Sequence, residues 1–182
     1  MKIYLARHAE TNYNLLKLCN SDPAVDVHLT DKGIAQAENL SKTLYEADFD
    51  SVYISELPRT RQTAEIVNRS HNKAITVDAR LNDNQTGFEG KPVTKWLTAL
   101  RASKDQWTAN FNGGESLERT VERVTDFMNE LIVQPYASVL IVTHGFITQA
   151  IFGYIENKIR DEALEFQLPQ GTYAEFEISP RN

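Results

Sequence analysis

Two short runs of consecutive apolar residues limit the possible folds most strongly: residues 3–6 and residues 139–142. Runs of this length are typical of strands covered on both faces, as in a parallel sheet packed between helices. Residue 138 extends the second run, and three further β-rich runs are predicted as strands, at residues 51–54, 75–77 and 173–178. The last of these alternates in polarity and is expected at a sheet edge or in a hairpin.

Helical patterns fill the gaps between these runs. Thr30 is a predicted N-cap for a helix with apolar residues at 34, 37, 40 and 44, and Pro58 suits the first turn of another. Further helices are predicted to begin near Ser116 and directly after Gly145. Strands that alternate with helices predict the α/β class, a three-layer α/β/α sandwich around a mostly parallel sheet. Residues 88–114 are less regular and are interpreted as a lid or insertion.

Composition narrows the choice of function. The 182 residues contain no repeat or linker-like stretch, so one domain over residues 1–182 is expected. The net charge of −6, without a basic cluster, argues against a nucleic-acid partner, and no apolar run is long enough to span a membrane. Cys19 is the only cysteine, which excludes an internal disulfide and favours a cytoplasmic location.

Polar residues whose side chains could bind a ligand or catalyse a reaction follow the predicted strands. Arg7 and His8 follow the first strand, Arg59 lies shortly after the second, Asp83 follows the third and His144 follows the fourth. Ligands of open α/β sheets bind at the carboxyl ends of the strands, so these five side chains are expected to meet there.

This set of residues suits chemistry on a phosphate ester. Arginine binds phosphate oxygens through two parallel hydrogen bonds, and neutral imidazole is a good nucleophile near neutral pH. A carboxylic acid can protonate the leaving oxygen. We therefore expect a small phosphorylated metabolite as the ligand.

Six segments resemble, in order, the motifs of the histidine phosphatase (phosphoglycerate mutase-like) superfamily. The resemblance covers residues 2 to about 155. The segments are Arg7-His8-Ala9-Glu10-Thr11 with Asn14, residues 29–37 (LTDKGIAQA), residues 55–64 (SELPRTRQTA), residues 81–90 (LNDNQTGFEG), residues 113–116 (GGES) and residues 142–145 (VTHG).

The resemblance implies a phosphatase that forms a phosphohistidine intermediate on His8 and needs neither a metal nor an organic cofactor. It implies that Arg7, Arg59 and His144 complete the phosphate pocket and that Asp83 donates the proton. Positions that match the substrate side of the site are Asn14, Glu115 and Gly145.

Two departures from the family pattern affect this expectation. Ala9 replaces the usual glycine, and its methyl group is expected against the phosphate-binding turn. Asp83 is one methylene shorter than the usual glutamate, so Glu89 is kept as an alternative proton donor.

Two alternative functions stay open from sequence. A phosphotransferase of the mutase type would use the same residues, although dedicated mutases of this family tend to be longer. A weakly active module that binds a phosphorylated ligand is also compatible with Ala9 and Asp83. The chain is expected to be a monomer or a homodimer, and substrate specificity is expected to come from residues 19–27 and 88–111.

Overall fold

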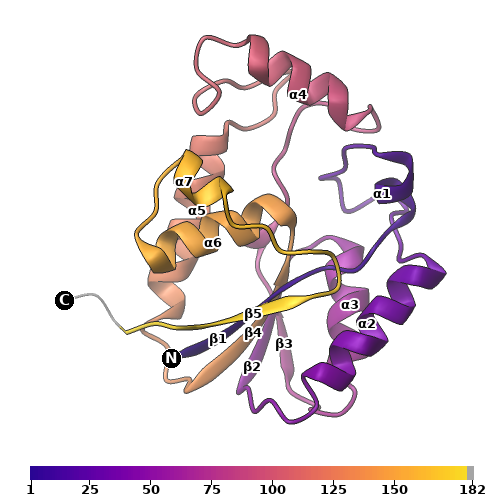
Figure 1. The fold of residues 1–182 in the computed structure, drawn as a ribbon, viewed down its shortest axis with the longest axis vertical. Helices are drawn as coiled ribbons and strands as arrows, with labels where there is room; N and C mark the ends of the chain where they lie inside the picture. Colours follow the sequence, from indigo (N-terminus) through magenta and orange to yellow (C-terminus); the bar gives the residue numbers. More distant parts are fainter. Residues whose placement is uncertain (180–182) are drawn as a thin grey trace.

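A computed structural model describes residues 1–179, and its centre is one five-stranded sheet (Figure 1). The strand order is β3-β2-β4-β1-β5, and only β5 runs antiparallel to its neighbour. The predicted α/β class, the mostly parallel sheet and all five predicted strands are confirmed. The strands are β1 (Lys2–Arg7), β2 (Ser51–Ile54), β3 (Ala74–Val77), β4 (Ser138–Thr143) and β5 (Tyr173–Glu177).

The four predicted helices are present and begin at the predicted signals. Thr30 and Ser116 accept hydrogen bonds from backbone N–H groups in the first turns of α2 and α5, and Pro58 is the first residue of α3. The helix after the fourth strand begins at Gly145. Their bounds are α2 (Asp31–Thr43), α3 (Pro58–Asn68), α5 (Leu117–Leu131) and α6 (Gly145–Glu156).

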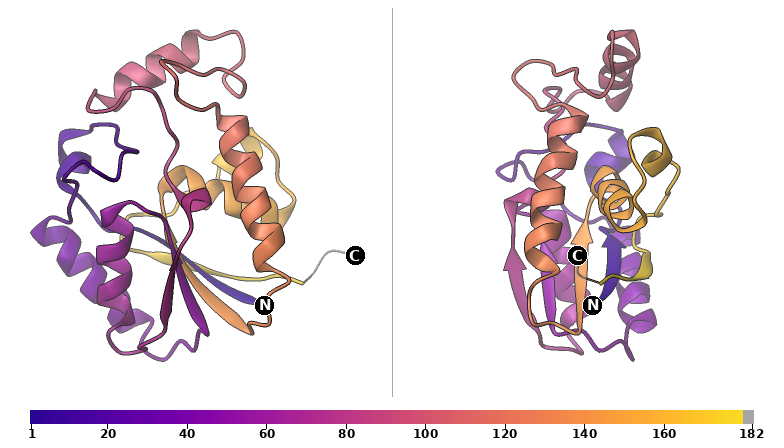
Figure 2. Two further views of the ribbon diagram at one scale, coloured as in Figure 1. Left: turned by 180° about the vertical axis from the view of Figure 1, so that it is seen from behind. Right: turned by 90° about the vertical axis from the view of Figure 1, so that its left-hand side faces the viewer.

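Helices cover both faces of the sheet and form three layers (Figure 2). Alternate side chains of β1 and β4 enter two separate apolar clusters, because successive residues of a strand point to opposite faces. Ile3 and Ile141 pack with residues of α5 and α6. Tyr4 and Leu140 pack on the other face, with residues of α2 and α3. The two central strands are therefore covered on both sides, as the apolar runs predicted.

Three short helices and one turn of 3-10 helix were not predicted. They are α1 (Asn12–Leu16), η1 (Ala79–Leu81), α4 (Val93–Ala102) and α7 (Asp161–Leu164). Helix α4 lies in the stretch interpreted as a lid, and Leu100 is the buried residue among its members. Val93, Trp96, Leu97 and Leu100 recur at helical spacing, a signal that the prediction missed. In Figure 1, α1 and α4 lie beyond the carboxyl ends of the parallel strands. Within residues 1–179, no helix combines the length and apolarity that a bilayer crossing requires.

Candidate active site

His8 follows β1 and is buried, with 3% of its surface exposed. Its backbone N–H donates to the carbonyl of Thr143 in the neighbouring strand, which fixes the start of the loop. Its Nδ1 lies 2.8 Å from the carbonyl oxygen of Ala9. A carbonyl only accepts hydrogen bonds, so Nδ1 carries the proton and Nε2 keeps a free lone pair.

The surroundings of His8 keep its ring neutral. Burial lowers the pKa of His8 well below its usual value, and the positive charges of Arg59 and Arg7 lower it further. A neutral ring with an unprotonated Nε2 is the form in which histidine acts as a nucleophile.

His144 follows β4 and is fully buried beside His8, with ring centroids 5.2 Å apart. Its Nε2 bonds to Ser55 Oγ at 2.9 Å, and its Nδ1 accepts from Arg59 Nε at 3.2 Å. Because arginine can only donate, His144 carries its proton on Nε2 and donates it to Ser55. Burial, with the nearby charge of Arg59, lowers the pKa of His144 well below its usual value.

Arg7 ends β1 and reaches across to the N-terminus of α6. Its Nη1 donates to the carbonyl of Leu168, while its Nε is buried without a hydrogen-bond partner among residues 1–179. A Cβ added to Gly145 would lie 3.2–3.4 Å from the guanidinium, so the absence of a side chain there gives Arg7 its room. The N-terminus of a helix and an incompletely bonded guanidinium together favour an anion.

Arg59, in the first turn of α3, is 4% exposed and is held by several acceptors. Its two terminal nitrogens donate to the side chain and backbone oxygens of Asn20 at 2.8 and 3.0 Å. It also pairs with Asp83 at 3.1 Å. Asn20 therefore positions Arg59, a role that no sequence motif indicated.

Asp83 lies near the ring of His144 at the edge of the site. Its Oδ2 accepts from Arg59 and lies 3.8 Å from Nδ1 of His144, while Oδ1 accepts the backbone N–H of Asn84. Its side chain is 32% exposed, so the carboxyl group is open on one side. Glu89 lies elsewhere, because its carboxylate accepts from the N–H and hydroxyl of Ser21. The geometry thus favours Asp83 over Glu89 as a group that could reach a ligand.

These residues line a cavity of about 250 Å³ at the carboxyl end of the sheet. Six residues predicted from sequence line it together: Arg7, His8, Asn14, Arg59, Asp83 and Gly145. His144 lies directly behind, against His8 and Arg59. Apolar or aromatic side chains come from the segments that hold α1, α4 and the start of α6: Tyr13, Leu18, Val27, Val93, Trp96 and Phe146. Uncharged polar residues, Thr11, Asn20, Asn84 and Thr86, complete the lining together with Cys19.

Three residues selected from sequence, Asn14, Glu115 and Ala9, lie in different surroundings. Asn14 lines the cavity, but its Oδ1 accepts from the backbone and side chain of Thr11. Glu115 is absent from the cavity walls and instead binds Arg123 through both carboxylate oxygens. The expected methyl group of Ala9 against the phosphate turn is also not found. Ala9 is fully buried in an apolar cluster with Leu29, Ala37 and Ile66, so its side chain points away from the cavity.

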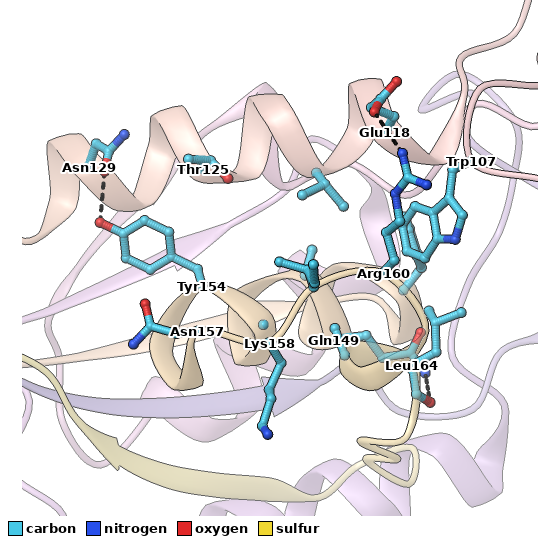
Figure 3. A pocket seen from close by; sticks show the side chains of 16 residues that line it. Trp107, Glu118, Thr125, Asn129, Gln149, Tyr154, Asn157, Lys158, Arg160 and Leu164 are labelled. Atoms are coloured by element: carbon cyan, nitrogen blue, oxygen red, sulfur yellow. Dashed lines mark hydrogen bonds and ion pairs between the residues drawn. The ribbon is translucent and has the colours of Figure 1, made fainter.

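A larger cavity of about 490 Å³ lies between α5, α6 and α7 (Figure 3). Several of its polar side chains are already bonded: Tyr154 donates to Asn129, Arg160 pairs with Glu118, and Gln149 donates to backbone carbonyls. Neither a histidine nor a cysteine lines it. The smaller cavity is therefore the better candidate for chemistry, and the described residues contain no cluster of side chains suited to a metal ion.

Comparisons with known proteins point to one family. A family model described as histidine phosphatase superfamily (branch 1) matches residues 3–182. The adenosylcobalamin/alpha-ribazole phosphatase of Escherichia coli K12 is 25% identical over 188 residues, which cover 100% of this chain and 92% of that protein. A Citrobacter koseri protein named "Probable phosphoglycerate mutase GpmB" is 30% identical over 155 residues, covering 80% of this chain and 70% of that protein.

A solved structure agrees with these relatives. The crystal structure of the alpha-ribazole phosphatase from Shigella flexneri superposes with a TM-score of 0.87 at 26% identity. The match covers 98% of this chain and 91% of that one.

Proposed function

The chain is an enzyme that belongs to the histidine phosphatase superfamily (branch 1), and we propose that it hydrolyses small phosphate monoesters through a phosphohistidine on His8. The observation that carries this proposal is the hydrogen bond from His8 Nδ1 to the carbonyl of Ala9. It leaves the Nε2 lone pair free on a ring that burial keeps neutral.

The first step transfers the phosphoryl group to the protein. The Nε2 lone pair of His8 attacks phosphorus, the bond from phosphorus to the ester oxygen breaks, and protonated Asp83 gives its proton to the departing oxygen. The products are an alcohol and a phosphohistidine. The open side of Asp83 and its position beside His144 support this role.

The second step regenerates the enzyme. Water attacks the phosphohistidine while the Asp83 carboxylate accepts a proton from it, and the bond between phosphorus and Nε2 breaks. Inorganic phosphate leaves, His8 is neutral again and Asp83 is again protonated. Over the two steps one ester and one water molecule become one alcohol and one phosphate, and the protein returns to its starting state.

The negative charge on the phosphoryl oxygens is stabilised by groups that are already in place. Arg7 and Arg59 contact the non-bridging oxygens, and the N-terminus of α6 adds its dipole. Asn20 holds Arg59 before the substrate arrives, so little reorganisation is needed. The unpartnered Nε of Arg7 supports its assignment as an anion ligand.

A mutase activity is the second candidate, because a relative named as a phosphoglycerate mutase matches at 30% identity. Phosphatase activity is preferred, because within residues 1–179 the cavity is lined by no lysine or arginine besides Arg7 and Arg59 that could bind the carboxylate of a phosphoglycerate. We propose a small-molecule substrate, and the lone Cys19 supports a reducing compartment such as the cytoplasm.

The test measures phosphate release from phenyl phosphate by the wild-type chain and two histidine variants. His8→Ala is expected to reduce the rate by at least about 10⁴-fold, because it removes the nucleophile. His28→Ala, at an exposed histidine, is the matched control and should keep full activity. Equal rates in the wild type and His8→Ala would contradict the proposal and favour a binding module. Faster interconversion of 2- and 3-phosphoglycerate than phosphate release would favour the mutase.

A further inference from the structure

The half of the cavity beyond the phosphate-binding groups indicates what the ester carries. We propose that the substrate is a monophosphate whose leaving alcohol is uncharged and bears an apolar, preferably aromatic, group held between Trp96 and Phe146. The inference rests on the proposed function and narrows its substrate class.

The first argument is the distribution of charge along the cavity. Its formally charged residues are Arg7, Arg59 and Asp83, and all three belong to the phosphate-binding end. The exposed lysines nearby, Lys17, Lys91 and Lys95, are not among the lining residues. A second phosphate or a carboxylate on the substrate would therefore have no cation of its own to bind.

The same end also disfavours a second anion. Arg7 and Arg59 are the cations that line this end, and both are engaged by the oxygens of the transferred phosphoryl group. Arg123 lies on the far side of Asp83, where it binds Glu115 and the backbone carbonyl of Asp83. Its charge is already compensated by the Glu115 carboxylate, so it offers no site for a substrate anion.

The second argument is the composition of the opposite walls. They consist of the six apolar or aromatic residues from the segments around α1, α4 and α6, with Trp96 and Phe146 both partly exposed. Apolar surface of this kind gains free energy when an apolar group covers it. Aromatic walls additionally favour a ring that can stack or meet them edge to face.

Trp96 and Phe146 are held in place from behind. Both pack against an apolar cluster formed by Leu100, Trp107 and Leu117, and the rings of Trp107 and Phe146 lie 6.4 Å apart. Their positions thus follow from packing of α4 and α6 on the start of α5. A cavity of about 250 Å³ lies below the usual range for drug-sized ligands, which limits the apolar group to about one ring.

The test compares three primary alkyl phosphates, so that differences in the leaving oxygen are small. They are 2-phenylethyl phosphate, ethyl phosphate and 3-phosphoglycerate. We expect kcat/KM to be about tenfold higher for the phenylethyl ester than for the ethyl ester. We expect 3-phosphoglycerate to fall at least about tenfold below the ethyl ester, because of its unpaired carboxylate.

Three variants assign the preference to residues. Trp96→Ala should raise KM for 2-phenylethyl phosphate on the order of tenfold and remove most of its advantage over ethyl phosphate in kcat/KM. Circular dichroism and urea denaturation check that this variant folds. Trp96→Phe should keep most of the preference. Thr94→Ala, at an exposed position of the same helix, is the matched control and should change kcat/KM for neither substrate.

A gain of function completes the design. Val93→Lys introduces a cation into the apolar wall and should raise kcat/KM for 3-phosphoglycerate by about tenfold. Hydrolysis that depends on His8 but favours 3-phosphoglycerate in the wild type would overturn this inference and leave the proposed function standing. If the chain hydrolyses none of the three esters and no phenyl phosphate, this inference and the proposed function are both overturned.

Discussion

The rings of His8 and His144 lie with their centroids 5.2 Å apart and their planes inclined by 58°, at the ends of the neighbouring strands β1 and β4. The two residues carry their protons in different places. The Nδ1–H of His8 donates a hydrogen bond to a backbone carbonyl, and the Nε2–H of His144 donates a hydrogen bond to Ser55. The lone pair of His8 is thus on Nε2 and is free. The lone pair of His144 is on Nδ1 and accepts a hydrogen bond from Arg59.

Ser55 is predicted to position His144. Its hydroxyl accepts from His144 Nε2 and from the N–H of Leu57, and it bonds to Thr60. Ser55→Ala leaves a buried N–H without an acceptor, which should destabilise the fold by about 1–3 kcal/mol and lower kcat by about tenfold. NMR of the ring nitrogens should show a shifted Nε2–H signal that exchanges faster with water, because its acceptor is lost, while Arg59 keeps the proton off Nδ1. Ser51→Ala, at the start of β2 and far from the site, should leave the ring spectrum unchanged. An unchanged Nε2–H signal and unchanged kcat in Ser55→Ala would refute the positioning role.

Asp83 is predicted to protonate the leaving oxygen. Asp83→Asn should lower kcat on ethyl phosphate by about 100-fold or more, because an alkoxide is a poor leaving group. Phenyl phosphate needs less help and should lose no more than about tenfold. Both esters are compared by initial rates of phosphate release, and equal losses on the two would remove Asp83 from this role.

Glu115 is predicted to act on stability and not on substrate binding. Its half-buried ion pair with Arg123 is 2.6 Å long, so Glu115→Gln should lower the free energy of unfolding by about 1–3 kcal/mol with KM unchanged. Glu118→Gln disrupts a more exposed pair with Arg160 and should cost at most about 0.5 kcal/mol. Urea denaturation and steady-state kinetics test both variants. A raised KM with normal stability in Glu115→Gln would restore the substrate role expected from sequence.

Stability is predicted to fall as the pH falls below about 6.5. Burial lowers the pKa of both His8 and His144 in the folded chain, so the unfolded chain binds more protons in this range. Each histidine then removes up to about 1.4 kcal/mol of unfolding free energy per pH unit. Burial also lowers the pKa of His71, which adds to the trend.

Urea denaturation between pH 7.5 and 5.5 measures this slope. His8→Asn should make the slope shallower, because one buried titrating ring is lost. A slope that is the same in the wild type and in His8→Asn would show that His8 does not contribute.

Strand ends and helix starts were predictable from sequence because their signals are local. Apolar runs, the N-caps Thr30 and Ser116, and Pro58 each determine structure within a few residues. Parallel strands then bring Arg7, His8 and His144 together by topology alone. This part of the site needed no information on side-chain packing.

The remaining parts depend on contacts between distant segments. Asn20 meets Arg59 across 39 positions, and the loop that carries it has no periodic pattern. The motif position of Glu115 suggested a substrate contact, but Arg123 on the next turns of α5 captures its carboxylate. The methyl group of Ala9 could be placed only once the apolar cluster with Ile66 was known.

Direct detection of the intermediate tests the central claim. Rapid acid-free quenching of the enzyme during turnover of phenyl phosphate, followed by peptide mass spectrometry, should find one phosphoryl group on His8, on a peptide that is unmodified in His8→Ala. The label should form and decay at rates compatible with turnover. Steady turnover with no phosphoryl group on His8 at any time, or turnover that persists in His8→Ala, would contradict the account.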